Sequence, residues 1–571
     1  MNKIKLPFIL HCLIFTSIIF TSSQLYSQVE MVPPSDKIYD FLDRMSVNKI
    51  IDNYSSSMLP ISRREISKYL ITINVKRGKI SRTDKKILDD YLVEYEYDIQ
   101  RTLKNSSSFF SDFKFSDIFR DKKQKYLFSK ADSNVSFFWD AIGEMKYFGA
   151  KGDSLGKPHL STGLLGTRLR GTLFNSVGFY LRLSNGVRLG GTQEDAITAS
   201  HFDPVLASTR KFISEGSKTF DSFEGYLRYA TSSDWLGLTV GREALKFGTG
   251  FIDQLIISNN NSAPYDYIKL DLSYKKIRYT FFHSNLVGND SLGKQLSSKY
   301  LVFHRLEFGP LFNGVMKFSF NEMLLYSGVP INLAFINPIS FLTSADLNTE
   351  SPQKNTNNSI IALDAQFYPV KHLTVQGTFL IDDINFNTLG KNDVTSNDNK
   401  FAYQAGLEWQ DAFKISNFNF TYEYTRIDPF VYTHRENSNY YANWGLPIGH
   451  SLPPNSDEHA VKISYFAGSR LNLALTFKHQ RSGENLTDSI GNVLINYGSN
   501  ILHGENDFVI KNIFLNGLRV DRNIFIAEIT WQPIRQYFLS IKYQYEAVDN
   551  IFQNNRKLSD SIFWGTFRVD Y

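Results

Sequence analysis

Side chains suited to carbohydrate chemistry gather in one long stretch between two predicted strands, residues 428–457. Aromatic faces pack against the C–H surfaces of sugars, and guanidinium and imidazole groups hydrogen-bond hydroxyls or acidic sugars. The alternative is that residues 429–435 fold inward as a structural loop, with tyrosine and histidine satisfied by neighbouring charges. A second stretch, 483–524, is longer but carries fewer aromatic residues. The candidate glycan-binding residues are Tyr432, His434, Arg435, Tyr440, Tyr441, Trp444 and His450.

The other chemistry-bearing residues form no recognisable reaction centre. The glycine-rich segment 241–250 lacks the Lys-Ser/Thr pair of a phosphate-binding loop. Asp382 and Asp383 stand at a strand end, where solvated acids or an arginine partner are expected rather than paired-acid chemistry. No nucleophile, base and orienting group are marked together, so we predict no enzyme, no metal and no cofactor. The histidines without ligand spacing are His201, His434, His450 and His459.

The strands that carry these loops have a period of two. Residues 537–546 largely alternate apolar and polar side chains. Residues 563–571 place Phe, Gly, Phe, Val and Tyr on one face and Trp, Thr, Arg and Asp on the other. One face of such a strand contacts water and the other does not. About ten residues suffice for a tilted strand to cross a membrane.

Long and short connections alternate between these segments. Outer-membrane barrels have this asymmetry, with short periplasmic turns and long outer loops. We therefore predict a mainly β protein, a transmembrane antiparallel β-barrel of about 18 strands over residues 134–571. The expected strands lie near 134–149, 160–174, 177–189, 222–232, 235–243, 265–275, 277–285, 300–308, 313–321, 360–369, 372–382, 401–410, 417–427, 458–467, 470–482, 525–533, 537–548 and 561–571.

Composition excludes other classes. No run of about twenty apolar residues follows the N-terminal segment, so a helical membrane protein is excluded. Aromatic residues make up 15% of the 571 residues, which suits the aromatic girdles of a barrel. A soluble β-sandwich or propeller also alternates, but it exposes fewer aromatic side chains.

The first 27 residues have the features of a secretory signal peptide. Lys3 and Lys5 precede an apolar core at 6–20, and Ser27 offers a plausible cleavage point. Cys12, the only cysteine, lies in that core, so the processed chain would have no thiol. Losing the two lysines changes the formal charge from +5 to +3. This balance favours neither nucleic acid nor an acidic partner.

Residues 28–104 have a helical period, and we predict a small α-helical periplasmic domain there, with a connector at 105–133. Three short amphipathic helices must pack together or against the mouth of the barrel. The basic residues expected on solvated faces of these helices are Arg63, Arg64, Lys85 and Lys86.

The helix starts have recognisable caps. Ser35 or Asp36 can cap the first helix, and Ser81 can cap the third. Ser62 and Glu65 have the spacing of a capping box at the second helix.

Charged residues share the polar face of the predicted strands. Both signs occur, which predicts a lattice of ion pairs in the lumen rather than a selectivity ring. Such a lattice narrows or blocks the bore and favours a plugged, rigid platform over an open pore. The residues are Arg168, Arg170, Lys269, Asp271, Arg305, Glu307, Glu423, Lys462, Lys478, Glu528, Lys542 and Arg568.

A series of motifs, in order along the chain, resembles the Wzi capsule-assembly family of Gram-negative outer membranes. The chain departs from the family pattern at Phe247, where tryptophan is expected, and at Pro453 and Pro454, where glycine is frequent. The motifs are IYDFLDRM at 38–45, LPISRREI at 59–66, GR and FGTG within 241–250, Glu322 with YSG at 326–328 and FINP at 335–338, LIDD at 380–383, EYTR at 423–426, PFVYTHR at 429–435 and GHS at 449–451.

The resemblance implies an eighteen-stranded barrel, a periplasmic helical bundle and a lectin-like role in retaining capsular polysaccharide. We therefore predict an outer-membrane protein that retains or organises surface polysaccharide through its extracellular loops. Its expected partners are surface or capsular polysaccharide, outer-membrane lipid and periplasmic export or assembly components at the helical domain, without nucleic acid. The alternative is a channel for a glycan fragment or another polar solute. A hydrolase with a Ser/His/acid cluster on one rim ranks third.

Overall fold

The structure, a computed structural model, describes residues 28–571 except 53, 113–114, 120, 289–297, 350–356, 388, 390–398, 436–437, 490, 505–512 and 552–555. The predicted signal segment, 1–27, therefore lies outside the described residues. Within the described part, none of the helices is long and apolar enough to cross a membrane.

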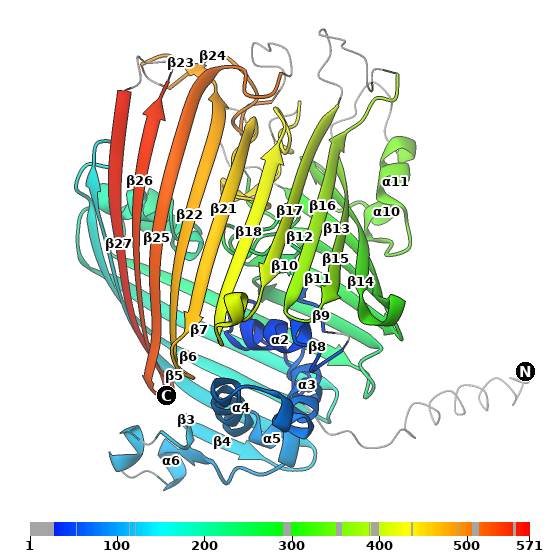
Figure 1. Cartoon of the computed structure of the whole chain (residues 1–571), viewed down its shortest axis with the longest axis vertical. Coiled ribbons are helices and arrows are strands. Elements are labelled where there is room, and N and C mark those ends of the chain that lie inside the picture. The colour runs from blue at the N-terminus through cyan, green and yellow to red at the C-terminus, as the bar shows by residue number, and fades with distance from the viewer. Residues whose placement is uncertain are drawn as a thin grey trace, which may run out of the picture.

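Eighteen antiparallel strands form a closed barrel (Figure 1). It closes where β27 pairs with β5, from Asp570 opposite Ile142 to Asp560 opposite Gly152. Every predicted strand has one observed counterpart, so the predicted barrel is confirmed. The strands are β5 (Val135–Gly152), β6 (His159–Leu173), β7 (Val177–Gly190), β8 (Thr219–Ala230), β9 (Leu236–Glu243), β11 (Tyr265–Tyr274), β12 (Ile277–Asn285), β13 (Lys299–Leu311), β14 (Met316–Ser327), β15 (Asn358–Val370), β16 (Leu373–Asp383), β17 (Lys400–Trp409), β18 (Phe418–Ile427), β21 (Ser456–Phe466), β22 (Leu471–Glu484), β25 (Leu518–Ile534), β26 (Tyr537–Asn550) and β27 (Arg556–Asp570).

The period of two assigns the two faces of the barrel. Tyr543, Phe563 and Phe567 are exposed on the outer face. Trp564 and Arg568, on the other parity of β27, line an interior cavity. The polar side chains of the strands therefore face the barrel interior and the apolar ones face outward, as in a membrane barrel with a hydrated interior.

Several strands extend farther toward the long loops than the sequence pattern predicts. β25 begins at residue 518 rather than 525, and β14 ends at 327 rather than 321. In the added part of β25, Arg519 pairs with Asp521 at 2.6 Å and Arg522 pairs with Glu484. There the outward positions are polar and the inward ones, Val520 and Ile524 among them, are mostly apolar. The two faces have therefore exchanged polarity, although the strand pairing continues.

The connections differ between the two ends of the barrel. Turns at one end are short, as at 275–276 and 535–536, where Lys275 and Gln536 adopt the left-handed conformation with φ of 56° and 70°. Long loops leave the other end, although the connections at 153–158 and 551–555 are short. The asymmetry predicted from sequence is present, with these two exceptions.

Four helices cover the end with the short turns (Figure 1). Their apolar faces form a separate core built from residues such as Leu42, Leu70 and Leu88. They are α2 (Ile38–Val47), α3 (Arg63–Val75), α4 (Arg82–Glu94) and α5 (Glu96–Gln100). We call these four helices the helical layer.

The caps predicted at Ser62 and Ser81 are present, whereas the N-cap of α2 is Lys37 rather than Ser35 or Asp36. Ser62 and Ser81 accept the N–H groups of Glu65 and Asp84 at 3.1 and 3.0 Å. Asp36 accepts the N–H of Ile38 at 2.9 Å. The side chain of Glu65 pairs instead with Arg278 of β12 at 2.5 Å, because the helix packs against the barrel and an ion pair is available there.

The prediction that Arg63 and Arg64 are solvated is wrong. Arg63 is buried, pairs with Asp98 at 2.9 Å and lies over the ring of Tyr95. Arg64 is fully buried, because its guanidinium donates to carbonyls of two short turns of the barrel, those of Asn175 at 2.7 Å and Thr231 at 2.7 Å.

Candidate functional site

Two of the long loops, 244–264 and the described residues of 428–455, fold back into the barrel. The N-terminal strand β1 (Met58–Leu59) joins them by pairing with β10 (Lys246–Phe247). Together they form an apolar core against the inner faces of β11 to β18. One side of the bore is therefore filled with protein.

Glu423 of β18 holds the first inward loop at its turn. Its Oε2 accepts the N–H of Phe251 at 2.6 Å, and its Oε1 accepts those of Ile252 and Asp253 at 3.1 and 3.4 Å. Gln376 donates to the same carboxylate at 3.0 Å. Three consecutive N–H groups around one carboxylate fix the loop to the barrel wall.

Tyr432 and Tyr441 connect the second inward loop to the first. Both are fully buried. The hydroxyl of Tyr432 donates to the carbonyl of Leu255 at 2.6 Å, and that of Tyr441 donates to the carbonyl of Ile256 at 2.7 Å. The two loops therefore form one unit.

Asp253 is the polar centre of this unit. Its carboxylate accepts from the hydroxyls of Ser258 at 2.5 Å and Ser451 at 2.9 Å, and from the amide of Asn261 at 2.9 Å. Burial alone would raise the pKa of Asp253, but His450 and these donors together lower it below its usual value.

The same cluster contains serine, histidine and aspartate, but not in catalytic order. Ser451 donates to Asp253 rather than to His450, and Nδ1 of His450 accepts the N–H of Leu452 at 3.0 Å. Burial lowers the pKa of His450 more than Asp253 raises it. A hydrolytic triad needs a serine-to-histidine bond and an oriented histidine. This cluster holds two loops together instead.

The seven predicted glycan residues occupy two different environments. The structure brings Tyr432, Tyr441 and His450 together around loop 244–264, as the inward-folded alternative predicts. Tyr440 is also buried, with the ammonium of Lys299 at 3.8 Å from its ring centre. His434 and Trp444 are half-buried and Arg435 is exposed. Glycan contact by these residues stays a prediction.

Asp382 and Asp383 have different partners from those expected. The carboxylate of Asp382 accepts the N–H of Tyr432 at 2.5 Å. Asp383 pairs with Lys400 at 2.7 Å. The first acid positions the inward loop and the second forms an ion pair at the rim.

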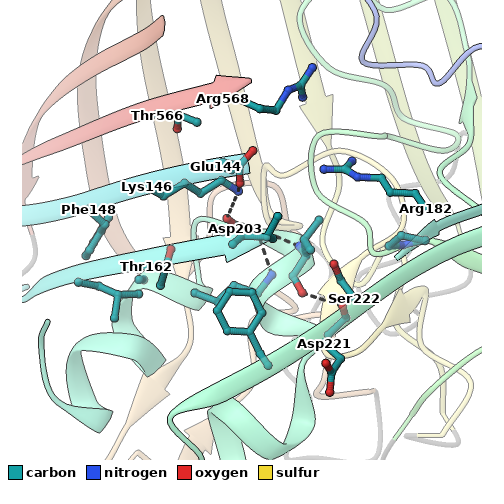
Figure 2. A pocket seen from close by; sticks show the side chains of 18 of the residues that line it. Glu144, Lys146, Phe148, Thr162, Arg182, Asp203, Asp221, Ser222, Thr566 and Arg568 are labelled. Carbon is teal, nitrogen blue, oxygen red and sulfur yellow. Dashed lines mark hydrogen bonds and ion pairs between the residues drawn. The ribbon is translucent and has the colours of Figure 1, made fainter. Parts of the chain in front are cut away.

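A cavity of about 310 Å³ lies inside the barrel, against β5 to β8 and β27 (Figure 2). Three short helices from the loop between β7 and β8 also fold inward and border it. Their apolar side chains pack on the inner faces of these strands, as Phe212 does on Phe220. The helices are α7 (Gln193–Ser200), α8 (Pro204–Ala207) and α9 (Arg210–Ser214).

Lys146 ties this loop to the barrel wall. Its ammonium lies 3.3 Å from Asp203 and 3.3 Å from Glu144, and Figure 2 shows the three side chains converging. Asp203 also accepts the N–H groups of Val205 and Leu206 at 3.0 and 3.1 Å. Burial would raise the pKa of Asp203, but Lys146 and the two N–H groups lower it below its usual value.

The cavity has balanced charge and an aromatic wall. Trp564 and Phe148 are neighbours, with ring centres 5.9 Å apart. Arg182 lies 3.9 Å from Glu224, beyond hydrogen-bond distance, which leaves its donors available. The four basic and four acidic residues of the lining are Lys146, Arg182, Arg242 and Arg568, and Glu144, Asp203, Asp221 and Glu224.

Sequence reasoning missed this cavity. Its signal was the charged residues at alternate positions of β5, Glu144 and Lys146, together with Arg182 of β7. The inward fold of the 191–218 loop had no comparable signal, because its helices are short and their partners lie on other strands. Among the described residues, no group of three or more His, Cys, Asp or Glu could hold a metal ion.

The fold and the interior define an eighteen-stranded β-barrel whose bore is partly filled by its own loops. The family described as capsule assembly protein Wzi matches residues 179–561. The chain therefore belongs to the Wzi capsule-assembly family, and its closed barrel lies in the outer membrane.

A solved structure agrees on the fold. Wzi of Escherichia coli, described as an outer-membrane protein involved in group 1 capsule assembly and as a carbohydrate-binding β-barrel, is 13% identical with a TM-score of 0.57, covering 95% of this chain and 99% of its own. OprD of Pseudomonas aeruginosa (9% identity, TM-score 0.43, 76% of this chain and 95% of its own) and OccAB1 of Acinetobacter baumannii (9%, 0.44, 76% and 96%) are more distant and support no inference. No curated protein sequence matches the chain.

Proposed function

We propose that this protein binds surface polysaccharide and retains or organises it at the outer face of the outer membrane. The family supports capsule assembly, and the E. coli Wzi structure is described as carbohydrate-binding. The helical layer would lie in the periplasm, because it covers the end with the short turns. There it could meet export or assembly components.

The observation that carries this proposal is the filled side of the bore. Glu423, Asp253 and the two buried tyrosines fix two long loops inside the barrel, and β1 pairs with one of them. Loops held in this way form a rigid outer platform. A diffusion channel, the alternative function, needs the opposite arrangement.

Two surfaces of the protein suit sugar contact. Trp444 and Arg435 lie in the accessible part of loop 428–455. The cavity near Arg182 offers donors, acceptors and the ring of Trp564. Because its acidic and basic residues balance, an uncharged pyranose would enter without leaving a buried charge unpaired. Weak contacts of this kind along a repeating polymer gain strength from avidity over many copies.

Binding of the purified surface polysaccharide to the full chain in lipid nanodiscs tests the proposal. We expect measurable retention, reduced by at least tenfold in Ser222→Trp, which fills the cavity. Leu165→Trp, at an outward-facing position of β6, is the matched control and should bind normally. If the polymer does not bind to the unaltered protein, the proposed function is wrong.

Conductance measurements across planar bilayers distinguish polymer retention from the alternative function, a channel. The retained-polymer function predicts no steady single-channel current. A current that is blocked by oligosaccharides, without retention of the polymer, would establish a channel instead.

A further inference from the structure

The connection between β14 and β15 packs on the outside of the barrel rather than over its mouth. It contains α10 (Leu333–Ile336) and α11 (Leu342–Thr349), which lie along the flank of the barrel in Figure 1. Phe335 and Leu342 are buried against outward-facing side chains of the wall. Those wall residues are Phe281, Val302, Leu324 and Tyr326. We call residues 328–349 the flank segment.

The flank segment reaches deep along the barrel. The hydroxyl of Tyr279, close to the short-turn end of β12, donates to the carbonyl of Pro338. The ring of Phe341 stacks on that of Phe320, low in β14, with centres 6.3 Å apart. β12 has nine residues, about the number that crosses the hydrocarbon core. The segment therefore overlaps the depth of the membrane.

Polar side chains of the outer wall lie beneath the segment. His283, His304 and Glu322 point outward from β12, β13 and β14, yet they are 9%, 7% and 1% exposed. The carboxylate of Glu322 accepts both the N–H of Thr343 at 2.7 Å and its hydroxyl at 3.0 Å. Ionisable groups on the lipid face of a barrel destabilise it, and this cover removes them from lipid.

The outer edge of the segment is apolar. In water such a patch would be a liability. Against hydrocarbon it continues the lipid-facing surface of the neighbouring strands. The exposed side chains are Ile331 (51%), Leu333 (79%), Ile336 (37%), Ile339 (91%) and Phe341 (50%).

Several N–H groups of the irregular backbone of the segment have partners. At membrane depth, backbone polar groups need partners inside the protein. Asn332 and Asn337 cap the N–H groups of Ala334 and Ile339 at 2.9 and 3.1 Å, and Pro338 has no N–H. The backbone N–H groups that donate within the segment or to β14 include those of Asn332, Ala334, Phe335, Ile339, Ser340, Thr343 and Ala345.

We propose that the flank segment is a lipid-embedded cover whose apolar edge contacts acyl chains of the outer membrane. Its depth, its apolar outer edge and the ionisable groups that it covers all suit contact with hydrocarbon. This inference does not depend on polysaccharide binding.

Quenching by brominated lipid tests the contact. Because Cys12 is the only cysteine, a Cys12→Ser background allows single labelling sites. Ile339→Cys, labelled with an environment-sensitive dye, is placed in full-length protein in vesicles of dibromo-phosphatidylcholine. We expect at least a twofold loss of fluorescence relative to unbrominated phosphatidylcholine vesicles, together with protection from aqueous iodide.

Two control sites calibrate the result. Phe563→Cys on the outer wall of β27 should be quenched similarly, and Leu494→Cys in an outer loop should respond only to iodide. Quenching of the Ile339→Cys dye by iodide alone would place the segment in water and overturn the proposal. Shielding from both quenchers would mean that a second copy covers the segment, which would also overturn it.

Discussion

The rings of Tyr432 and Tyr441 stack with centres 5.2 Å apart and planes at 17°, and their hydroxyls donate to consecutive carbonyls of another loop. Two residues whose types suit sugar contact thus hold one inward loop against the other. Their buried rings support the platform from beneath.

Removing these hydroxyls should loosen the inner loops. In Tyr432→Phe or Tyr441→Phe, a buried carbonyl loses its donor, which costs about 1–3 kcal/mol of local stability. We expect faster proteolysis within residues 244–264, with an unchanged barrel signal in circular dichroism. Tyr543→Phe, on the exposed outer face, is the control. Equal cleavage in all three variants would contradict the bridging role.

Trp444 should contact the polymer without supporting the loops. We expect Trp444→Ala to weaken binding of the purified polysaccharide by roughly tenfold, or about 1.4 kcal/mol, at unchanged melting temperature. Trp444→Phe keeps an aromatic face and should retain most of the affinity. Tyr432→Ala differs, because its ring is buried and its loss should lower stability as well. Full affinity in Trp444→Ala would remove this residue from the site.

Arg64 should hold the helical layer on the barrel. Its planar guanidinium donates to the carbonyls of Asn175 and Thr231 and pairs with Asp234 at 3.1 Å. Both Arg64→Met and Arg64→Lys should leave buried carbonyls without donors, costing about 3–5 kcal/mol. We expect protease to cut the helical layer at least tenfold faster in both variants.

Lys68→Met provides the comparison for Arg64. Lys68 also pairs with Asp234, but nearly half of its side chain is exposed. Its loss should change the cleavage rate little, as for an exposed ion pair. Cleavage as fast as in Arg64→Met would show that the helical layer is held by charge near Asp234 rather than by the buried guanidinium of Arg64.

Asp43 should make the helical layer less stable at higher pH. Burial, with Glu408 nearby, raises the pKa of this α2 carboxyl to about 7. The folded state therefore binds a proton that the unfolded chain, with a pKa near ~3.9, releases. Stability should fall as pH rises from about 4 to about 7 and then stay level.

Asp43→Asn should abolish this dependence. Thermal unfolding of the helical layer, followed by protease sensitivity, should show the variant to be more stable than the unaltered protein at pH 8. The two should converge near pH 4. A variant that is less stable at pH 8 would contradict the assigned ionisation.

The strands and their order were readable from sequence because each depends on a local alternation. Tyr543 and Phe563 face outward for the same reason that Lys542 and Trp564 face inward. The helix starts at Ser62 and Ser81 were readable as well, because each cap joins residues three positions apart. The extra length of β25 was not readable, because its added outward positions are polar, the reverse of the pattern in the rest of the strand.

The site depended on contacts between distant parts of the chain. Glu423 meets Phe251 across 172 residues of sequence, and Arg64 reaches Thr231 across 167. Neither pairing produces a periodic pattern in the sequence. Arg64 therefore looked like a surface residue, and Tyr432 could be read equally as a sugar contact or as a loop support.

The sequence by itself determined a membrane-spanning barrel, its short-turn end and its helical start, since hydrophobic period and capping act between near neighbours. Only the tertiary structure decided which loops fill the bore, where the cavity lies and that residues 328–349 cover the outer wall. Those outcomes arise from burial and hydrogen bonding between segments that meet only after the barrel closes.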